Sequence, residues 1–263
     1  MDDLDFILNS LLEEQPGYRQ LIIPSDLLGK RQLFRSLLNS RPPFPVSEIL
    51  LEAQDEELQK QLHEKGVVVL NQAKVSPIDN RLILWQGDIT RLKVDAIVNA
   101  ANSKMLGCFV PLHSCIDNAI HSAAGIQLRL ECNELMKIQG YPEPTGSAKI
   151  TKGYNLPVKF VIHTVGPIIG NGGVTQKEEN ELSDCYHSCL RLADECNLKS
   201  IAFCCISTGE YRFPNQLAAE IAVRTVREYL DQSVDSAIEA VVFNVFKDID
   251  FSIYSKLLQT DQE

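Results

Sequence analysis

The sequence of 263 residues has no long apolar run, no cluster of basic residues and no low-complexity tract. A transmembrane helix needs about 20 consecutive apolar residues, so we expect no association with a membrane. The acidic start, residues 1–5, lacks the basic region and the apolar core of a secretion signal. We therefore expect a cytoplasmic protein whose eight cysteines stay reduced.

Positive charge is scarce as well. Lys and Arg number 25 against 35 for Asp and Glu, which gives a net charge of −10. DNA binding needs a concentrated basic surface, and no Lys/Arg run supplies one, so no DNA partner is expected. A small phosphorylated ligand is compatible with the sequence, because helix N-termini and backbone N–H groups hold phosphate without net positive charge.

Two common catalytic patterns are missing, since the chain has no GxGxxG motif and no arguable Ser–His–Asp arrangement. It instead carries Cys108, His113 and Cys115 within eight positions. Zinc prefers such thiolate and imidazole ligands, and three protein ligands leave one position for water or substrate, as in catalytic zinc sites. A structural zinc site would need a fourth ligand. The Cys–His–Cys set therefore favours a zinc-assisted hydrolase over the alternative of two buried thiols and a surface imidazole.

The remaining cysteines and two histidines fit a packed interior. The other six cysteines fall on predicted helices or on an apolar strand and are interpreted as core residues: Cys132, Cys185, Cys189, Cys196, Cys204 and Cys205. His163 lies in an apolar strand, which favours a hydrogen-bonded core histidine. His121 follows Asp117 at i, i+4 helical spacing, so it either pairs with that carboxylate or packs against the sheet.

Residues 1–75 are predicted to form a helical N-terminal extension, because their apolar residues recur with helical periodicity. Three helices are expected: over residues 3–12, from a cap at Ser25 to residue 38, and from a cap at Ser47 to a stop at Gly66. Three short helices bury little apolar surface alone. We therefore expect them to pack on the main domain.

Residues 76–263 alternate strands with helices, which predicts a three-layer α/β/α fold with a mixed, mostly parallel sheet. Strands are expected at residues 82–85, 96–98, 147–151, 160–163, 200–206 and 240–245, and helices at 116–124, 126–139, 178–196, 214–230 and 250–258. Ligands of such sheets bind at the carboxyl ends of the strands. The loops after the strands are thus the place to look for function.

Polar residues follow several of these strands and are expected to converge on one rim. The small residues and free N–H groups of the turn from Ser207 to Gly209 suit a phosphate, although an ordinary strand–helix turn is the alternative. Asp88 either caps a turn or accepts a hydrogen bond from an exocyclic amine such as that of adenine. Asn99 and Asn102 are either turn residues or amides that bind ribose hydroxyls.

Five ordered motifs between residues 82 and 258 resemble those of macrodomains, a family that binds ADP-ribose and in which many members remove it from proteins. The motifs are Gly87-Asp88-Ile89-Thr90, Val98-Asn99-Ala100-Ala101-Asn102, Asp117-Asn118-Ala119-Ile120-His121, Val161-Ile162-His163-Thr164-Val165-Gly166-Pro167 and Ile206-Ser207-Thr208-Gly209-Glu210-Tyr211-Arg212-Phe213-Pro214. The resemblance implies a macrodomain over residues 76–263.

Two departures separate the chain from most hydrolytic macrodomains. Their glycine-rich catalytic loop, which precedes the position of Asp117, is replaced here by residues 107–115 with the Cys–His–Cys set. This is similar to the microbial zinc-dependent macrodomains, which also carry a helical N-terminal extension. The second departure is Glu210 and Arg212 in the phosphate loop, where many relatives have an apolar residue and glycine. Arg212 either adds charge to the pyrophosphate pocket or restricts it.

At the adenosine end, the resemblance implies that Asp88 binds the adenine amine, with Ile89 at its flank. Phe246 or Asn244, after the last strand, would also flank the base. The residues implied to wrap the pyrophosphate, largely by backbone N–H groups, are Ser207, Thr208, Gly209, Glu210 and Tyr211.

At the distal ribose, the resemblance implies that Asn102 holds the sugar and that Phe213 packs against it. Asp117 occupies the position of the catalytic carboxylate. Zinc on the Cys–His–Cys set would either activate water, with Asp117 as base or orienting group, or grip a ribose hydroxyl and position the scissile bond.

The function expected from these residues is zinc-dependent removal of mono-ADP-ribose from modified proteins, most readily from carboxylate side chains. The alternatives are an ADP-ribose reader without turnover and a structural zinc protein whose metal only fixes a loop. The expected partners are ADP-ribose and an ADP-ribosylated protein. Relatives of this type are linked with a sirtuin-like ADP-ribosyltransferase and a lipoylated carrier protein, which suggests such a carrier as substrate by analogy.

Overall fold

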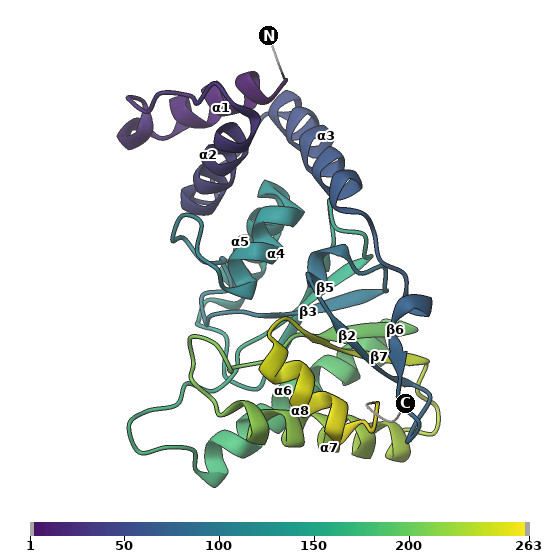
Figure 1. The fold of residues 1–263 in the computed structure, drawn as a ribbon. Coiled ribbons are helices and arrows are strands. Elements are labelled where there is room, and N and C mark those ends of the chain that lie inside the picture. The colour runs from purple at the N-terminus through teal and green to yellow at the C-terminus, as the bar shows by residue number, and fades with distance from the viewer. Residues whose placement is uncertain (1–2, 261–263) are drawn as a thin grey trace.

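The computed structural model describes residues 3–260, and its first three helices form a layer at one end of the molecule (Figure 1). α1 (Asp3–Glu14), α2 (Leu27–Ser40) and α3 (Glu48–Lys65) enclose a leucine-rich core of their own, to which Ile126 and the partly buried Leu130 are added from outside. The cap of α2 is Asp26, whose carboxylate accepts the N–H of Gly29 at 2.8 Å, and not Ser25 as expected.

Seven strands form one mixed sheet in the order β1-β2-β7-β6-β3-β5-β4. The strands are β1 (Lys74–Val75), β2 (Leu82–Gln86), β3 (Ala96–Ala100), β4 (Ala148–Lys152), β5 (Phe160–Thr164), β6 (Ser200–Phe203) and β7 (Ala240–Val245). The five inner strands are parallel, and the edge strands β1 and β4 pair antiparallel. The expected mixed, mostly parallel sheet is confirmed, with β1 as a short strand that periodicity did not reveal.

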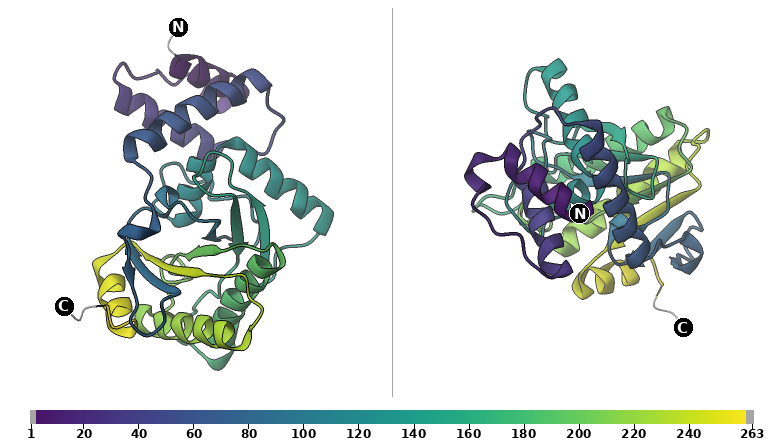
Figure 2. Two further views of the ribbon diagram at one scale, coloured as in Figure 1. Left: turned by 90° about the vertical axis from the view of Figure 1, so that its right-hand side faces the viewer. Right: turned by 90° about the horizontal axis from the view of Figure 1, so that it is seen from above.

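Helices cover both faces of this sheet, which completes the three-layer α/β/α fold (Figures 1 and 2). One face carries α4 (Ile116–Ala124) and α5 (Ile126–Gln139), and the other carries α6 (Gln176–Glu195), α7 (Asn215–Gln232) and α8 (Asp248–Leu257). The extension lies over α4 and α5, so that these two helices separate it from much of the sheet. None of the helices in residues 3–260 is long and apolar enough to cross a membrane.

The sheet opens between β3 and β6 at the carboxyl ends of the strands. These two strands pair only at Ala96 with Ile201 and at Ile97 with Ala202. β6 ends at Phe203, three residues before the end of the expected strand, because its continuation diverges from β3 into a turn. A crevice at this point, outside the carboxyl ends of parallel strands, is where ligands of α/β sheets bind.

The buried cysteines and His163 belong to the core, with one exception. Cys132, Cys185, Cys189 and Cys204 are buried, and Cys205 is half-buried. The core assignment is wrong for Cys196, which is exposed. It follows the last turn of α6, where the chain turns away through Asn197 in the left-handed conformation, at φ +54°.

Candidate active site

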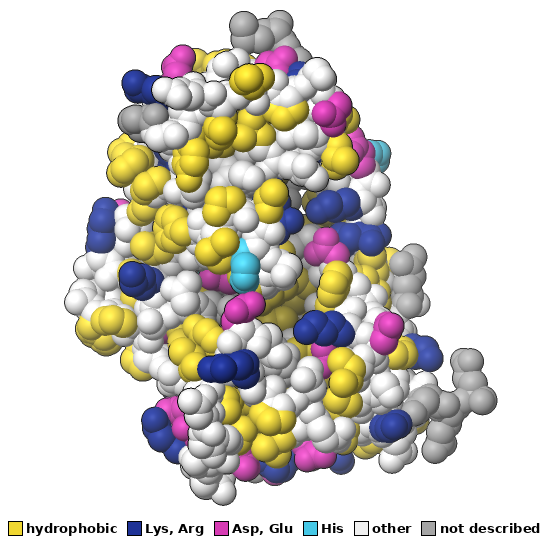
Figure 3. Space-filling view, turned by 60° about the vertical axis from the view of Figure 1, so that its left-hand side comes forward, with side chains coloured by type: hydrophobic (Ala, Val, Ile, Leu, Met, Phe, Trp, Pro, Cys, Tyr) yellow, Lys and Arg dark blue, Asp and Glu magenta, His cyan; other side chains and the backbone are white. Residues whose placement is uncertain are grey.

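The loops after β2, β3, β6 and β7 meet above the carboxyl ends of the sheet. The face shown in Figure 3 is hollowed at mid-height, with hydrophobic side chains in the hollow and charged side chains around it. After β2, Asp88 caps the short 3₁₀ helix η3 (Ile89–Arg91), and its Oδ1 accepts from the N–H and the hydroxyl of Thr90 at 3.0 and 2.6 Å. Its Oδ2 lies 3.8 Å from Lys65 Nζ. The capping role is therefore filled by one oxygen, and the other is available to a ligand.

The turn after β6, residues 206–214, is the phosphate loop, and it forms hydrogen bonds within itself. The N–H of Phe213 donates to Ser207 O at 2.9 Å, and that of Arg212 donates to Gly209 O at 3.0 Å. The N–H groups of Gly209, Glu210 and Tyr211 donate to no other group of residues 3–260. Such a row of free donors in a turn is a site for a phosphate.

The close approach of Gly166 to Ser207 fixes this turn. The Oγ of Ser207 is buried without a hydrogen-bond partner within residues 3–260, and the residue has φ +63°. A Cβ at Gly166 would come within 2.0 Å of that Oγ, so only glycine fits there. A buried hydroxyl without a partner costs free energy unless a ligand satisfies it. The free N–H groups and the unpaired Ser207 hydroxyl are compatible with the predicted anion site.

The metal loop, residues 106–115, connects the end of β3 to α4 and carries the Cys–His–Cys set. Ligand atoms of Cys108, His113 and Cys115 lie within 4.8 Å of one another. Ligand atoms around a tetrahedral zinc lie roughly 3.5–4 Å apart, given bonds of about 2.0–2.3 Å. The set therefore fits zinc with small adjustments of its side chains. All three residues are half-exposed, so the site is open to solvent.

The electrostatics of the metal loop also suit a cation. Burial first, and then the neighbouring Cys108 and Asp117, raise the pKa of the Cys115 thiol to about 12. Cys115 also caps α4, where its Sγ accepts the N–H of Asn118 at 3.4 Å. A bound divalent cation would stabilise the deprotonated form of these groups, because a thiolate and not a thiol binds metal.

Asp117 lies beside the metal loop, in the first turn of α4, and is only 5 % exposed. Asn99 donates to its Oδ1 at 2.8 Å and Asn102 to its Oδ2 at 3.3 Å. Burial raises the pKa of Asp117 to about 6, against the opposing effect of these hydrogen bonds and of Arg129. Such a pKa suits a general base at neutral pH, ionised and still basic.

A chain of hydrogen bonds under the site fixes this carboxylate. A carboxylate only accepts, so the amide nitrogen of Asn99 faces Asp117, and the same nitrogen lies 3.1 Å from His163 Nδ1. That ring nitrogen is thus an acceptor, and Nε2 carries the hydrogen toward Thr151 Oγ1 at 2.9 Å. His163 is the satisfied core histidine that the sequence suggested. Asn99, by contrast, is fully buried and holds Asp117 instead of a ribose.

A second group of possible metal ligands lies deeper and does not suit a metal. His121, Cys132 and His163 also bring ligand atoms within 4.8 Å. The two nitrogens of His163 are already engaged by Asn99 and Thr151, and all three residues are buried. His121 Nε2 is 3.5 Å from Asp117 Oδ1, and its ring lies under Gly107, where a Cβ would come within 2.8 Å. We assign these residues to support of the metal loop.

The phosphate loop and the metal loop meet across the crevice. Glu210 Oε1 lies 3.6 Å from His113 Nε2, and the Glu210 side chain is 70 % exposed. The pKa of Tyr211 is raised by burial first, and then by the charges of Asp117 and Cys115, which places its hydroxyl within electrostatic reach of both. The two loops thus enclose the end of the crevice nearest β3.

Three residues implied for ligand contact pack differently from the expectation. The side chains of Ile89 and Phe213 are each 1 % exposed and belong to the core, so these positions offer backbone rather than side chain at the surface. Asn244 is also buried, and its amide donates to Gly87 O at 3.0 Å, which ties β7 to the loop after β2. Phe246, at 75 % exposed, is the ring available beside that loop. Their roles toward a ligand stay predictions.

One important site residue gave no signal in the sequence. Arg129 of α5 is buried, and it donates to Leu106 O at 2.7 Å at the start of the metal loop. Its guanidinium lies 4.4 Å from the ring centroid of Phe109, and burial lowers its pKa to about 10. Its position is set by tertiary packing, which no local motif encodes.

The chain is similar to known proteins over nearly its whole length. The Macro domain family matches residues 98–222. A protein-ADP-ribose hydrolase of Treponema medium is 49% identical over 257 residues, which cover 96% of this chain and 97% of the relative. One of Staphylococcus aureus (strain MRSA252) is 48% identical over 260 residues, covering 99% of this chain and 96% of the relative.

A solved structure is similar to this chain in its fold. The crystal structure of the Trypanosoma brucei macrodomain in complex with ADP-ribose is 32% identical, with a TM-score of 0.65. The match covers 85% of this chain and 94% of that one. The chain therefore belongs to the macrodomain family, in which its full-length relatives are protein-ADP-ribose hydrolases.

Proposed function

We propose that the protein is a zinc-dependent hydrolase that removes mono-ADP-ribose from modified proteins. The observation that carries the proposal is the position of the Cys–His–Cys set beside Asp117, at the β3 end of a crevice whose other end carries Asp88. β2 and β3 are three strand spacings apart, or roughly 14 Å at about 4.8 Å each. That span suits a dinucleotide-sized ligand lying across the sheet.

The order of the strands supports an order along ADP-ribose. Asp88 follows β2 and Phe246 follows β7, so the adenine belongs at this end. The free N–H groups of the phosphate loop follow β6 and would hold the pyrophosphate. Asn102 and the metal loop follow β3 and would receive the distal ribose. In this order the anomeric carbon would lie beside Asp117 and the candidate metal ligands.

Cys108, His113 and Cys115 are the residues that would hold zinc, since their ligand atoms are already gathered. When bound, zinc supplies a Lewis acid beside the ribose. Asp117 would orient the attacking water or take its proton, with Asn99 and Asn102 fixing the two carboxylate oxygens. His163 would keep Asn99 in place through its Nδ1.

The acceptor most compatible with this site is a carboxylate. In the hydrolysis, the water oxygen bonds to the anomeric carbon, the bond from that carbon to the acceptor oxygen breaks, and Asp117 accepts the water proton. A carboxylate leaves without needing a proton, whereas a guanidine leaves as a strong base and needs a proton donor. By analogy with relatives of this type, the proposal extends to a lipoylated carrier protein as the modified substrate.

The proposal is tested by removing one ligand. Cys115→Ala should abolish zinc binding and lower the rate of ADP-ribose release by ~1,000-fold, because metal ions supply several kcal/mol to such reactions. Cys196→Ala is the matched control, since Cys196 is an exposed thiol outside the site. Zinc content by mass spectrometry and release from a mono-ADP-ribosylated protein are the two measurements. Full release by a zinc-free Cys115→Ala protein would refute zinc dependence.

A reader module is the competing function, and the same substrates distinguish it. The hydrolase should release ADP-ribose from carboxylate acceptors faster than from serine or arginine acceptors. Equal or faster release from arginine would contradict the acceptor preference. Tight binding of the modified protein with no release over hours, in zinc-loaded protein, would identify a reader instead.

A further inference from the structure

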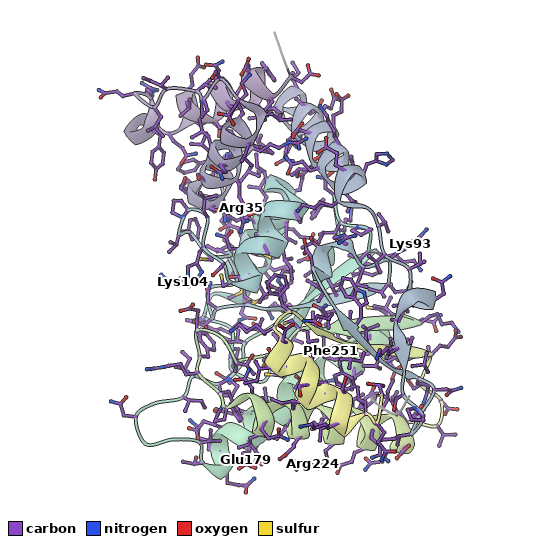
Figure 4. The ribbon with its side chains drawn as sticks, viewed as in Figure 1. Arg35, Lys93, Lys104, Glu179, Arg224 and Phe251 are labelled. Atoms are coloured by element: carbon purple, nitrogen blue, oxygen red, sulfur yellow. The ribbon has the colours of Figure 1, made fainter. Side chains whose placement is uncertain are left out.

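The second helix of the extension reaches the metal loop directly. Arg35 and Asn39 lie on α2, about 75 residues before the loop in the chain, and both bond to its backbone. Figure 4 shows Arg35 near the end of α2 that approaches α4 and α5. We propose that Arg35 and Asn39 are positioning residues that hold the metal loop in the shape that binds zinc, which makes the extension part of the active site. This inference rests on the zinc-dependent function proposed above.

Arg35 joins three elements through one guanidinium. Its Nη2 donates to His113 O at 3.1 Å, at the residue that supplies the imidazole ligand. Its Nη2 and Nε also donate to Asn118 Oδ1, at 2.8 and 3.3 Å. Asn118 in turn donates to Val110 O at 2.9 Å, so the same amide holds the loop a second time. Arg35 thereby fixes His113 relative to the N-terminus of α4, where Cys115 lies.

Asn39 holds the neighbouring part of the loop. It is 1 % exposed, and its Oδ1 accepts the N–H of Leu112 at 3.0 Å. Its amide nitrogen donates to Ser122 Oγ on α4 at 2.8 Å. Leu112 has φ +56°, a left-handed conformation that a leucine adopts only when its surroundings impose it. The hydrogen bond that the N–H of Leu112 donates to Asn39 Oδ1 is one such constraint, and Leu112 is next to His113 in the chain.

The buried side chain of Arg129 bonds both to the extension and to the start of the loop. Arg129 of α5 donates to Leu106 O, and also to Leu38 O and Arg41 O of the extension at 2.7 and 2.5 Å. One guanidinium thus bonds the first residue of the metal loop to the end of α2. The loop is thus bonded to α2 directly through Arg35 and Asn39, and indirectly through Arg129 of α5.

The loop has little else to hold it. Between residues 106 and 114, the one backbone hydrogen bond formed inside the loop runs from His113 N to Val110 O at 3.2 Å. Phe109, Val110 and Leu112 are exposed, so apolar burial does not fix their positions. Groups behind the ligands of a metal commonly set its affinity by orienting those ligands. Here two of the groups that hold the loop, Arg35 and Asn39, come from the extension, and they act beside contacts from the core.

The interface beside Arg35 is not fully packed. A cavity of about 120 Å³ lies between α2, α3 and α4, and Arg31, Arg35 and Ser122 are among its lining residues. Removing the Arg35 side chain would therefore enlarge a space that water can fill, instead of creating a sealed void. This makes Arg35→Ala a test of the hydrogen bonds with little expected loss of fold.

The experiment measures zinc affinity by competition with a chromogenic chelator in full-length protein. Arg35→Ala should weaken zinc binding by roughly 10–100-fold, the usual effect of removing a group that orients a metal ligand. Arg35→Lys keeps the charge but lacks the planar fork of donors that reaches His113 O and Asn118 Oδ1 together, so its zinc affinity should lie between those of Arg35→Ala and the wild type. ADP-ribose affinity, measured by calorimetry, should stay within about threefold, because the phosphate loop makes none of these contacts.

Arg31→Ala is the matched control on the same helix. Arg31 pairs with Glu57 and Glu64 of α3 and makes no bond to the metal loop. Its loss should leave zinc affinity unchanged. Wild-type zinc affinity in a folded Arg35→Ala protein would overturn the inference while leaving the proposed function intact, and an equal loss in both variants would overturn it too. Failure of the wild-type protein to bind zinc would count against the proposed function itself.

If Arg35→Ala lowers the unfolding temperature, Co²⁺ replaces zinc as the probe. Thiolate coordination gives Co²⁺ strong absorption bands whose position reports the ligand geometry. Arg35→Lys should shift or weaken these bands in folded protein. Bands identical to those of the wild type would again overturn the positioning role.

Discussion

The two loops that face each other across the crevice are built in opposite ways. The phosphate loop forms its hydrogen bonds within a few residues of itself, such as those from Phe213 to Ser207 and from Arg212 to Gly209. The metal loop depends on partners far away in the chain, such as Arg35 for His113 and Asn39 for Leu112. The shape of the phosphate loop is thus encoded locally, whereas the shape of the metal loop depends on tertiary structure.

This difference suggests how a hydrolase can be built on a binding fold. The α/β core supplies the proposed pocket with its own strands and turns. In the proposal, the ligands of the zinc ion depend also on contacts from α2. Binding and catalysis should therefore respond to different substitutions, and each prediction below tests that separation.

The largest effect is expected at the two carboxylates, one at each end of the crevice. Asp117→Asn should lower turnover by roughly 10²–10⁴-fold, the usual contribution of a general base, with little change in ADP-ribose affinity. Asp88→Asn should do the reverse, with weaker binding and nearly normal turnover at saturating substrate. The measurement is the separate determination of kcat and of the ADP-ribose Kd. Equal losses of both quantities in both variants would remove the distinction between the two ends.

The next effect is expected under the phosphate loop. In Gly166→Ala, the new Cβ would meet Ser207 Oγ at 2.0 Å and displace the turn. Overpacking of this kind costs about 1–3 kcal/mol, so ADP-ribose affinity should fall by roughly 5–100-fold. Zinc affinity should not change. Gly170→Ala is the control, because nothing lies within 4 Å of its Cβ position. A loss of zinc affinity in Gly166→Ala would show that the two loops are not independent.

The fold and the phosphate loop can be predicted from the sequence more readily than the residues that support the metal loop. Apolar periodicity indicates the parallel strands, and the turn from Ser207 to Gly209 follows one of them by short-range chemistry. The Cys–His–Cys spacing also shows the candidate ligands. Arg129 and Asn39, in contrast, read as an ordinary helical cation and a polar residue near a helix end. Their partners lie some 20 to 90 residues away, so no local pattern reveals them.

Motifs also do not show which polar residues are buried, and this decides the different roles of Asn99 and Asn102. Asn99 looked equivalent to Asn102 as an amide after a strand. In the structure its side chain is buried between Asp117 and His163, whereas Asn102 lies at the loop and bonds to Gly107 O. Which of two polar residues faces the ligand depends on where the strand ends relative to its neighbours. That register is a property of the whole sheet.

The smallest effect concerns the buried platform under the metal loop. Burial lowers the pKa of His163 to about 3, so the folded protein does not take up the proton that the unfolded chain binds below about pH 6.5. Stability should be lost as the pH falls from about 6.5 toward 3, at up to ~1.4 kcal/mol per pH unit. His163→Gln, whose amide can both accept from Asn99 and donate to Thr151, should show a shallower loss.

Neighbouring groups also change the stability with pH, so the effect of His163 is measured by comparing His163→Gln with the wild type. His121 has its pKa lowered by burial and contributes with the same sign, whereas the raised pKa of Asp117 contributes with the opposite sign between about pH 4 and 6. Cys132, the other group beside His163, stays neutral in this range. Urea unfolding at pH 7 and pH 5 measures the effect, expected as a difference of about 2 kcal/mol between the two proteins' losses. Equal losses would show that His163 is not a buried neutral histidine.

The central claim is that zinc on Cys108, His113 and Cys115 makes this macrodomain a hydrolase, and its most direct test uses the wild-type protein. Zinc is removed with a chelator and then titrated back while ADP-ribose release from a carboxylate-modified protein is followed. We expect release to stop on chelation and to return in full at one zinc per chain, with ADP-ribose binding unchanged throughout. Release at the full rate by metal-free protein would contradict the claim.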